Sequence, residues 1–302
     1  MVTPNLSKPR LSQQLRSATI VCVKGHYLPL YAEYIGTQMA TLTLEKWVDD
    51  LQTHGRYTFV RNDAIAGSGL SYEAVKKALQ RLARRGRIAK LKDYFFVTVP
   101  LEYARTGAPP PSWFVHDLMI AMKVPYYVGL LSAAALHGAS HQQPQEFQVV
   151  TDRSIRQLIA GRARIRFFAS KFVGRTSIMD VKTPTGTMRV STPEATAVDL
   201  VRFAKAAGSL DHVATVLPEL SPSLDPKKLL AAVRLIGDTP NAQRLGYILD
   251  HVNGRNLAAP LLKWIKRMGH RPVPLRTGRI AAEASEDHRW HVLVDQPLEV
   301  EA

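Results

Sequence analysis

The chain has 302 residues, which is enough for two domains of ordinary size. Its 40 lysines and arginines exceed its 25 aspartates and glutamates, and the resulting formal net charge of +15 favours a polyanionic partner. The single cysteine, Cys22, excludes an intramolecular disulfide framework and a zinc site built from cysteines, and it fits a reducing cytoplasm.

Residues 1–40 differ in composition from the rest of the chain. They show no hydrophobic period and mix proline, serine and glutamine with short apolar pieces, whereas regular patterning begins at Thr41. We therefore expect an N-terminal arm over residues 1–40. The alternative is a misassigned start, with translation beginning at Met39.

A helix, a strand and a second helix are predicted next. From Thr43, which we expect to be the N-cap, apolar residues follow helical spacing as far as Leu51, and Gly55 lies after the helix end. Residues 57–60 have the pattern of a short strand. A small helix near 62–66 and a Gly-Ser-Gly turn at 67–69 follow.

The most informative segment is 71–86, SYEAVKKALQRLARRG. Its apolar residues recur at helical spacing from Val75 to Leu82, so one face packs on a core while the opposite face is polar and basic. Ser71 is a good N-cap, and Gly86 lies where a helix end favours a left-handed residue. These features predict an amphipathic basic helix.

Two short strands, 87–91 and 94–98, are predicted directly after this helix. Helix, strand, helix, tight turn, basic helix and hairpin is the order of a winged helix-turn-helix, which we assign to residues 41–105 as a domain that binds double-stranded DNA. Residues 76–92 contain eight basic side chains and no acidic one, and Lys77, Gln80 and Arg81 are positioned to reach base edges. The predicted DNA-contacting residues are Ser71, Tyr72, Lys76, Lys77, Gln80, Arg81, Arg84, Lys90 and Lys92.

A mixed α/β C-terminal domain is predicted over residues 112–302, after the proline-rich stretch 106–111. The fold class is therefore α+β. The longest apolar stretch is interrupted by Lys123 and Pro125, so it predicts two buried helices, 112–122 and 127–136, and no membrane span or membrane partner. Further elements are expected as a strand at 146–151, a helix beginning at 192–194, helices at 227–236, 240–252 and 257–268, and a strand at 290–294.

A second basic run follows the strand at 146–151. Arginine suits the planar, bidentate recognition of phosphates and carboxylates. This run is a candidate surface for a toxin or a nucleic acid, and the alternative is a solvated basic edge of a sheet. Its candidate residues are Arg153, Arg156, Arg162, Arg164 and Arg166.

Catalytic motifs are not found, so we expect no enzyme activity, no cofactor and no metal. The chain has no Asp-x-Asp pair of the kind a nucleotidyltransferase uses to hold divalent metal, and it has no phosphate loop. We interpret His137 and His141 as residues at a helix end, and Glu194 and Asp199 as structural. We expect His288 and His291 to face opposite sides of the last strand.

Five segments of the chain together carry a family resemblance: LSYEAVKKALQRLARRGRIAKLKDYFFVTVP (70–100), PYYVGLLSAAALHGAS (125–140), RVSTPEATAVDLV (189–201), RLGYILDHV (244–252) and HRWHVLVD (288–295). In the order of these motifs, the chain resembles the AbiEi antitoxins of bacterial AbiE-type (type IV) toxin–antitoxin systems. The resemblance covers the chain from about residue 42 onward and departs from the family at 195–196, where an arginine that often follows Ser-Thr-Pro-Glu is replaced by Ala-Thr.

This resemblance implies a cytoplasmic transcriptional autorepressor whose N-terminal domain binds operator repeats in its own promoter. It also implies a C-terminal domain that counteracts a nucleotidyltransferase-like toxin. Two alternatives stay open from the residues alone. One is a plain transcriptional regulator with a ligand-sensing or dimerising second domain, and the other is a nucleic-acid-processing enzyme, which the missing carboxylate pair disfavours.

Overall fold

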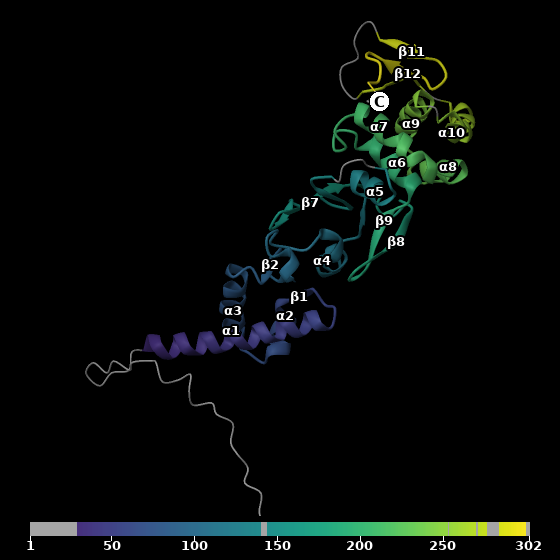
Figure 1. The fold of residues 1–302 in the computed structure, drawn as a ribbon. Coiled ribbons are helices and arrows are strands. Elements are labelled where there is room, and N and C mark those ends of the chain that lie inside the picture. Colours follow the sequence, from purple (N-terminus) through teal and green to yellow (C-terminus); the bar gives the residue numbers. More distant parts are fainter. Residues whose placement is uncertain (1–28, 140–143, 253, 270, 277–283, 300–302) are drawn as a thin grey trace, which may run out of the picture.

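The computed structural model describes residues 29–139, 144–252, 254–269, 271–276 and 284–299 (Figure 1). These residues form a mixed α+β structure, as the sequence predicts, and they contain three separate sheets. Figure 1 shows the N-terminal elements at one end, a group of helices capped by the small sheet of β11 and β12 at the other, and the largest sheet between them. In the described residues, no helix combines the length and apolar character that crossing a bilayer requires.

The N-terminal unit has the predicted order of elements. It contains a three-stranded antiparallel sheet in which the third strand lies between the other two. Its elements are α1 (Pro29–Thr53), β1 (Thr58–Val60), α2 (Arg61–Ser68), α3 (Tyr72–Arg84), β2 (Ile88–Lys90) and β3 (Phe95–Thr98).

The start of α1 corrects one prediction. The helix begins at Pro29, so it extends into the segment that was expected to be an arm, and Thr43 is not its N-cap. The Thr43 hydroxyl instead donates to the carbonyl oxygen of Met39, 3.0 Å away, one helical turn earlier. A threonine inside a helix can satisfy its hydroxyl in this way, and its local sequence then resembles a cap.

Side chains from all six elements form the core of the N-terminal unit. Leu44 and Val48 of α1 and Val75 and Leu79 of α3 belong to one cluster of buried side chains. Trp47 packs edge-on against Phe59 of β1 and lies directly over Gly67, where a β-carbon would be 2.0 Å from the indole nitrogen. This core fixes α3 so that its opposite face is exposed.

A six-stranded mixed sheet forms the middle of the molecule, in the order β6-β7-β5-β4-β9-β8. The structure corrects the prediction of a helix over 127–136, because Tyr126, Tyr127 and Val128 form a central strand paired with β5 and β9. A short strand buried on both faces has no alternating pattern, so hydrophobicity alone does not distinguish it from a buried helix. The elements of this part are η1 (Leu101–Tyr103), η2 (Pro111–Trp113), α4 (Val115–Met122), β4 (Tyr126–Val128), α5 (Leu130–Leu136), β5 (Phe147–Thr151), β6 (Leu158–Ala160), β7 (Ala163–Ala169), β8 (Ile178–Thr183) and β9 (Gly186–Ser191).

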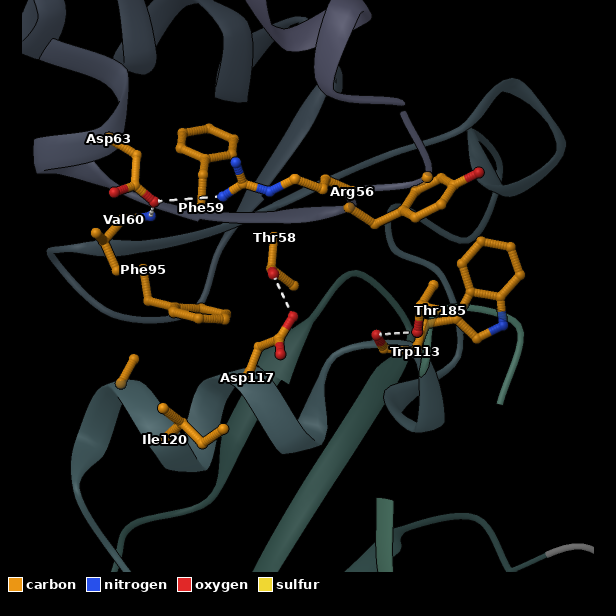
Figure 2. Close-up of a pocket in the computed structure, with 13 residues that line it drawn as sticks. Arg56, Thr58, Phe59, Val60, Asp63, Phe95, Trp113, Asp117, Ile120 and Thr185 are labelled. Carbon is orange, nitrogen blue, oxygen red and sulfur yellow. Dashed lines mark hydrogen bonds and ion pairs between the residues drawn. The ribbon is translucent and has the colours of Figure 1, made fainter. Parts of the chain in front are cut away.

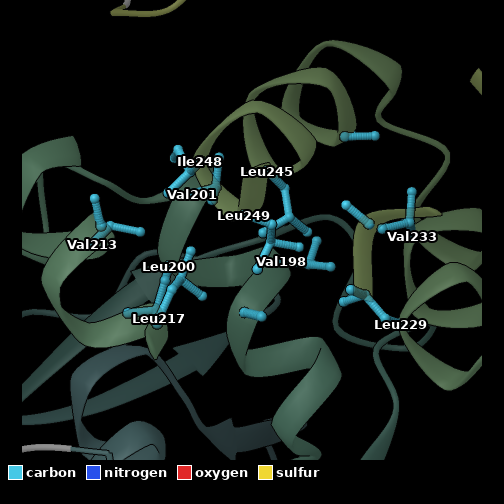
Figure 3. Close-up of a cluster of buried hydrophobic side chains, with 14 of the residues drawn as sticks. Val198, Leu200, Val201, Val213, Leu217, Leu229, Val233, Leu245, Ile248 and Leu249 are labelled. Carbon is cyan, nitrogen blue, oxygen red and sulfur yellow. The ribbon is translucent and has the colours of Figure 1, made fainter. Parts of the chain in front are cut away.

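A helical lobe follows the sheet and has its own large apolar core (Figure 3). Leu200 and Leu217 are fully buried at its centre, between α6 and α7. The predicted start of α6 is confirmed, since the Thr192 hydroxyl accepts from the Ala195 amide and Pro193 is the first helical residue. The lobe contains α6 (Pro193–Arg202), α7 (Leu210–Leu220), η3 (Ser221–Ser223), α8 (Pro226–Ile236), α9 (Thr239–His251) and α10 (Arg255–Met268).

A small third sheet, made of β10 (Val273–Pro274), β11 (Ser285–Asp287) and β12 (Val292–Val294), packs on α9. The Trp290 indole is fully buried against Gly246, and its nitrogen donates to Asp250 at 2.8 Å. The expected strand begins only at Val292, so His288 and His291 do not lie on opposite faces of a strand. Both have Nδ1 within 4 Å of the Glu286 carboxylate, at 3.9 and 3.0 Å.

The N-terminal unit and the six-stranded sheet share a continuous core. Phe95 and Val97 of β3 belong to the same buried cluster as Phe114 and Leu118 around α4. The proline-rich stretch 106–111 is packed rather than extended into solvent, because the Thr106 carbonyl accepts from the Arg162 amide at 2.7 Å and Ala108 is buried. The β1–β3 unit is therefore held against the sheet by apolar contact.

Candidate nucleic-acid interface

The exposed face of α3 carries most of the predicted DNA-contacting residues. The helix starts as expected, with the Ser71 hydroxyl accepting from the Ala74 amide at 3.4 Å, and it is followed by Gly86 in the left-handed region. Val75, Ala78, Leu79 and Leu82 are buried on the other face. Exposed side chains of the predicted set are Ser71, Tyr72, Lys76, Lys77, Gln80, Arg84 and Lys90, and Arg81 and Lys92 are partly exposed.

Acidic residues of α1 divide the run of eight cations. Glu45 lies 3.6 Å from Arg85 and 3.5 Å from Arg87, and Asp49 forms a further ion pair with Arg87. These two arginines are therefore compensated within the protein, and neither belongs to the predicted contact set. Local charge counting missed this pairing because Glu45 and Asp49 are about forty residues away in sequence.

Two further cations of the run have acidic neighbours, although both remain exposed. Lys90 lies 2.7 Å from Asp93 across the β2–β3 turn, and this ammonium lowers the pKa of the Asp93 carboxyl. Lys76 lies 3.9 Å from Glu73 on the same helix. Exposed pairs of this kind exchange partners readily, so both lysines stay available to phosphates.

Arg61 is a component of this surface that sequence reasoning did not identify. Its Nη1 donates to the Tyr72 hydroxyl at 2.7 Å, its guanidinium lies 5.4 Å from the centre of the Tyr72 ring, and it also donates to the Asp93 carbonyl. One arginine thereby links α2, the start of α3 and the β2–β3 turn. No short-range pattern indicates contacts across eleven and thirty-two residues.

The second basic run surrounds β6, the strand at one edge of the six-stranded sheet: Arg153 and Arg156 precede it, Arg162 follows it, and Arg164 and Arg166 lie on β7. Arg164 and Arg166 alternate with buried Ile165 and Phe167 along β7, so their side chains share one face. Ile159 on the edge strand is opposite Arg164 and is 58% exposed.

The arginines of this run do not form a single uncompensated site. Arg153 makes a two-pronged contact with Asp152, at 2.8 and 2.9 Å. Arg166 donates to Glu146 at 3.3 Å and lies over Phe168. Arg156 and Arg162 are exposed.

A cleft of about 420 Å³ lies between β1 and α4, and sequence reasoning did not identify it (Figure 2). The Thr58 hydroxyl donates to Asp117 across the cleft at 2.5 Å, and Arg56 lies 3.8 Å from Asp63 on the N-terminal side. Its carboxylates therefore have partners already. In the part of the chain that the structure describes, no three His, Cys, Asp or Glu side chains are grouped to hold a metal ion.

The residues considered for acid–base chemistry make contacts within the protein. Asp199 is 1% exposed, accepts from the Tyr127 hydroxyl at 2.6 Å and pairs with Arg202 at 2.7 Å. Burial raises the pKa of Asp199, and the Arg202 guanidinium opposes that rise.

The other candidate residues also contact the protein itself. Glu194 accepts from the Asp225 amide at 3.2 Å, at the start of α8. His137 lies 2.8 Å from the Ser191 carbonyl at the end of α5. His141 lies outside the described residues.

Taken together, the described residues form a mixed α+β structure with a basic helix–hairpin surface on its N-terminal unit. Residues 127–251, from β4 to the end of α9, match the family described as the AbiEi antitoxin C-terminal domain. This match supports the resemblance to the AbiEi antitoxins over residues 127–251 and suggests an antitoxin role in a toxin–antitoxin system.

A solved structure supports the fold of nearly the whole chain. The RV2827C protein from Mycobacterium tuberculosis has a similar crystal structure, with a TM-score of 0.59 and 15% sequence identity. The similarity covers 89% of this chain and 92% of that chain. No curated protein sequence matches the chain.

The structure shows which of the separated sequence motifs contact one another. The motif at 125–140 meets the motif at 189–201 through Tyr127 and Asp199 and through the pairing of β4 with β9. The motif at 244–252 meets the motif at 288–295 through Gly246, Asp250 and Trp290. The two motifs of each pair therefore pack against each other.

Proposed function

We propose that this protein is a DNA-binding antitoxin that represses transcription of its own operon. In this proposal residues 41–105 are a winged helix-turn-helix, α3 is the recognition helix and the β2–β3 hairpin is the wing. The observation that carries the proposal is the exposed, cation-rich face of α3 in a chain that also contains an AbiEi antitoxin domain. Such a helix fits the major groove, while a wing contacts the adjacent backbone.

The pairing of charges supports a division of tasks within the basic run. Arg85 and Arg87 are held by α1 and would stabilise the unit. Lys76 and Arg84 would contact phosphates, and Lys77, Gln80 and Arg81 would read base edges. Tyr72, held by Arg61, would set the position of the first turn of α3 on the backbone.

The proposed partner of the second domain is a nucleotidyltransferase-like toxin encoded beside this protein. That toxin class rests on the family resemblance, and the arginines on β7 are the proposed working surface. The proposed place of action is the cytoplasm, where chromosomal DNA lies. The second candidate function is a winged-helix regulator without a toxin, and it is favoured only if no nucleotidyltransferase-like protein is encoded next to the gene.

The DNA-binding part of the proposal is tested by fluorescence anisotropy with a duplex from upstream of the protein's own gene. Arg81→Ala and Lys77→Ala should each weaken binding by the equivalent of about 1–3 kcal/mol if they contact bases. Arg234→Ala, which removes one exposed charge from α8, is the matched control and should bind like the unmodified chain. Equal affinity and salt dependence for all variants would refute the assignment of α3.

The toxin-related part is tested separately by growth rescue in cells that express the toxin. Charge reversal at Arg162 and Arg164 should abolish rescue, whereas repression of a promoter reporter should survive. Loss of both activities would indicate misfolding or a shared surface. Retained rescue would remove the arginine run from the mechanism.

A further inference from the structure

The strand β8 forms an open edge of the six-stranded sheet. It is the last strand in the sheet order and pairs with β9 on one side (Figure 1). Ile178 and Met179 are 42% and 43% exposed, and Asp180 and Lys182 are also exposed. An edge strand presents unpaired backbone donors and acceptors to which another strand can bind.

The register with β9 determines which backbone groups of β8 are free. Just before β8, the Ser177 carbonyl accepts from the Thr192 amide at 3.0 Å, so this antiparallel pair is a hydrogen-bonded one. Because hydrogen-bonded and non-hydrogen-bonded pairs alternate, Met179 and Val181 also bond to β9. The backbone groups of Ile178, Asp180 and Lys182 therefore point to the open edge.

The side chains on this edge carry opposite charges at a spacing of two residues. Asp180 and Lys182 lie on the same face of β8, because alternate residues of a strand share a face. Among the residues that the structure describes, neither has an ion-pair partner. Asp180 lies opposite Arg189 of β9 without forming an ion pair with it, so both charges can accept a partner from outside the chain.

We propose that the open edge of β8 binds the same edge of a second copy of this chain, in an antiparallel pairing about a two-fold axis at Val181. This arrangement places Asp180 of each copy opposite Lys182 of the other, in hydrogen-bonded pairs that each exchange two backbone hydrogen bonds. The two Val181 residues then face each other on the axis. The six-stranded sheets of the two copies become one continuous sheet.

Charge complementarity selects this register over its neighbours. Only the even-numbered residues of β8 have backbone donors and acceptors that point to the open edge. Any alternative register must therefore also place even-numbered residues of the two copies opposite each other. Moving the two-fold axis from Val181 to residue 180 places the Asp180 residues of the two copies opposite each other. Moving the axis to residue 182 places the two Lys182 residues opposite each other. Like charges directly opposite each other destabilise a sheet, whereas opposite charges stabilise it.

Charged residues on an edge strand usually prevent edge-to-edge association. Here Asp180 and Lys182 disfavour the two neighbouring registers and favour the register with its axis at Val181. The same two residues therefore limit the association and determine its register. A contact of five residues per strand is small compared with a permanent dimer interface. The dimer should therefore be reversible and should appear as the concentration of the full chain increases.

Sedimentation equilibrium with charge variants of the full chain tests the pairing. Asp180→Lys alone and Lys182→Glu alone should each weaken self-association by about tenfold or more, because the two-fold symmetry makes each change act twice. A mixture of the two variants should associate again. The Lys182→Glu chain is acidic at positions 180 and 182, the Asp180→Lys chain has lysine at both, and the proposed register places the acids of one chain opposite the lysines of the other. This recovery excludes misfolding as the cause of the individual losses.

Disulfide trapping tests the position of the axis. With Cys22 replaced by Ser, Val181→Cys should form a covalent dimer under mild oxidation, because residues opposite each other in a non-hydrogen-bonded pair lie within disulfide reach. Met179→Cys is the matched control. It should not form a covalent dimer, because the proposed register places Met179 opposite Thr183 of the other copy. A chain that stays monomeric up to its solubility limit, a mixture that does not associate, or equal trapping at 179 and 181 would overturn the proposal.

Discussion

Gly246 on α9 is the position where a single methyl group tests the docking of the C-terminal sheet. A β-carbon there would lie 2.0 Å from Cζ3 of Trp290 and 2.3 Å from two further ring atoms. The indole is fully buried, and its nitrogen donates to Asp250 at 2.8 Å. The ring must therefore move by more than 1 Å or so to reach ordinary contact distance, which breaks this hydrogen bond.

The expected effect of Gly246→Ala is the sum of opposing contributions. Alanine stabilises a helix interior by roughly 1 kcal/mol relative to glycine. Against this, overpacking costs about 1–3 kcal/mol, and loss of a hydrogen bond to a carboxylate costs about 1.5–3 kcal/mol. We expect a net loss of about 1.5–5 kcal/mol in the free energy of unfolding.

Urea denaturation followed by circular dichroism measures this loss. Gly174→Ala is the matched control, because a β-carbon there meets no atom within 4 Å and the change should be nearly neutral. In a Trp290→Ala background the same Gly246→Ala change should become stabilising. If Gly246→Ala alone leaves stability unchanged or raises it, the packing of Trp290 on α9 is wrong.

Three further changes follow from individual contacts. Gly67→Ala should destabilise the N-terminal unit by about 1–3 kcal/mol, because its methyl group would overlap the Trp47 indole; a calorimetric scan with no lowered transition would contradict this. Tyr127→Phe should cost about 1–3 kcal/mol in urea unfolding, because buried Asp199 loses a donor, and an unchanged midpoint would show that the bond contributes nothing. Ser71→Ala should cost about 1 kcal/mol through the lost N-cap of α3, and Ser71→Asp, which keeps an acceptor, should restore the melting temperature.

Elements with local signals at both ends could be predicted from sequence. The sequence of α3 contains a capping serine, an apolar face and a glycine after the helix end. In the structure the serine caps the helix, the apolar face is buried and the glycine is left-handed. The start of α6 was equally clear, because Thr192 and Pro193 act within one turn of the chain. Such signals depend on contacts between near neighbours, so a sequence displays them directly.

Features that depend on distant residues could not be predicted. The strand 126–128 is buried on both faces, and only its pairing with β5 and β9 distinguishes it from a helix. The basic run was counted as uniform, although Glu45 on α1 compensates Arg85 and Arg87. The role of Arg61 beside Tyr72 likewise required the fold. In each case a tertiary contact decides what the local pattern leaves open.

The most direct test of the central claim locates α3 on DNA. In a Cys22→Ser background, Gln80→Cys places one thiol on the exposed face of α3, where an iron chelate that cleaves DNA can be attached. The matched control carries the chelate at Leu235→Cys, an exposed position on α8. If α3 is a recognition helix, the chelate at residue 80 should cut the upstream duplex at a few neighbouring nucleotides facing one major groove, and the chelate at residue 235 should not produce that pattern. Weak or identical cleavage from both positions, with the duplex bound, would contradict the claim that α3 lies in the groove.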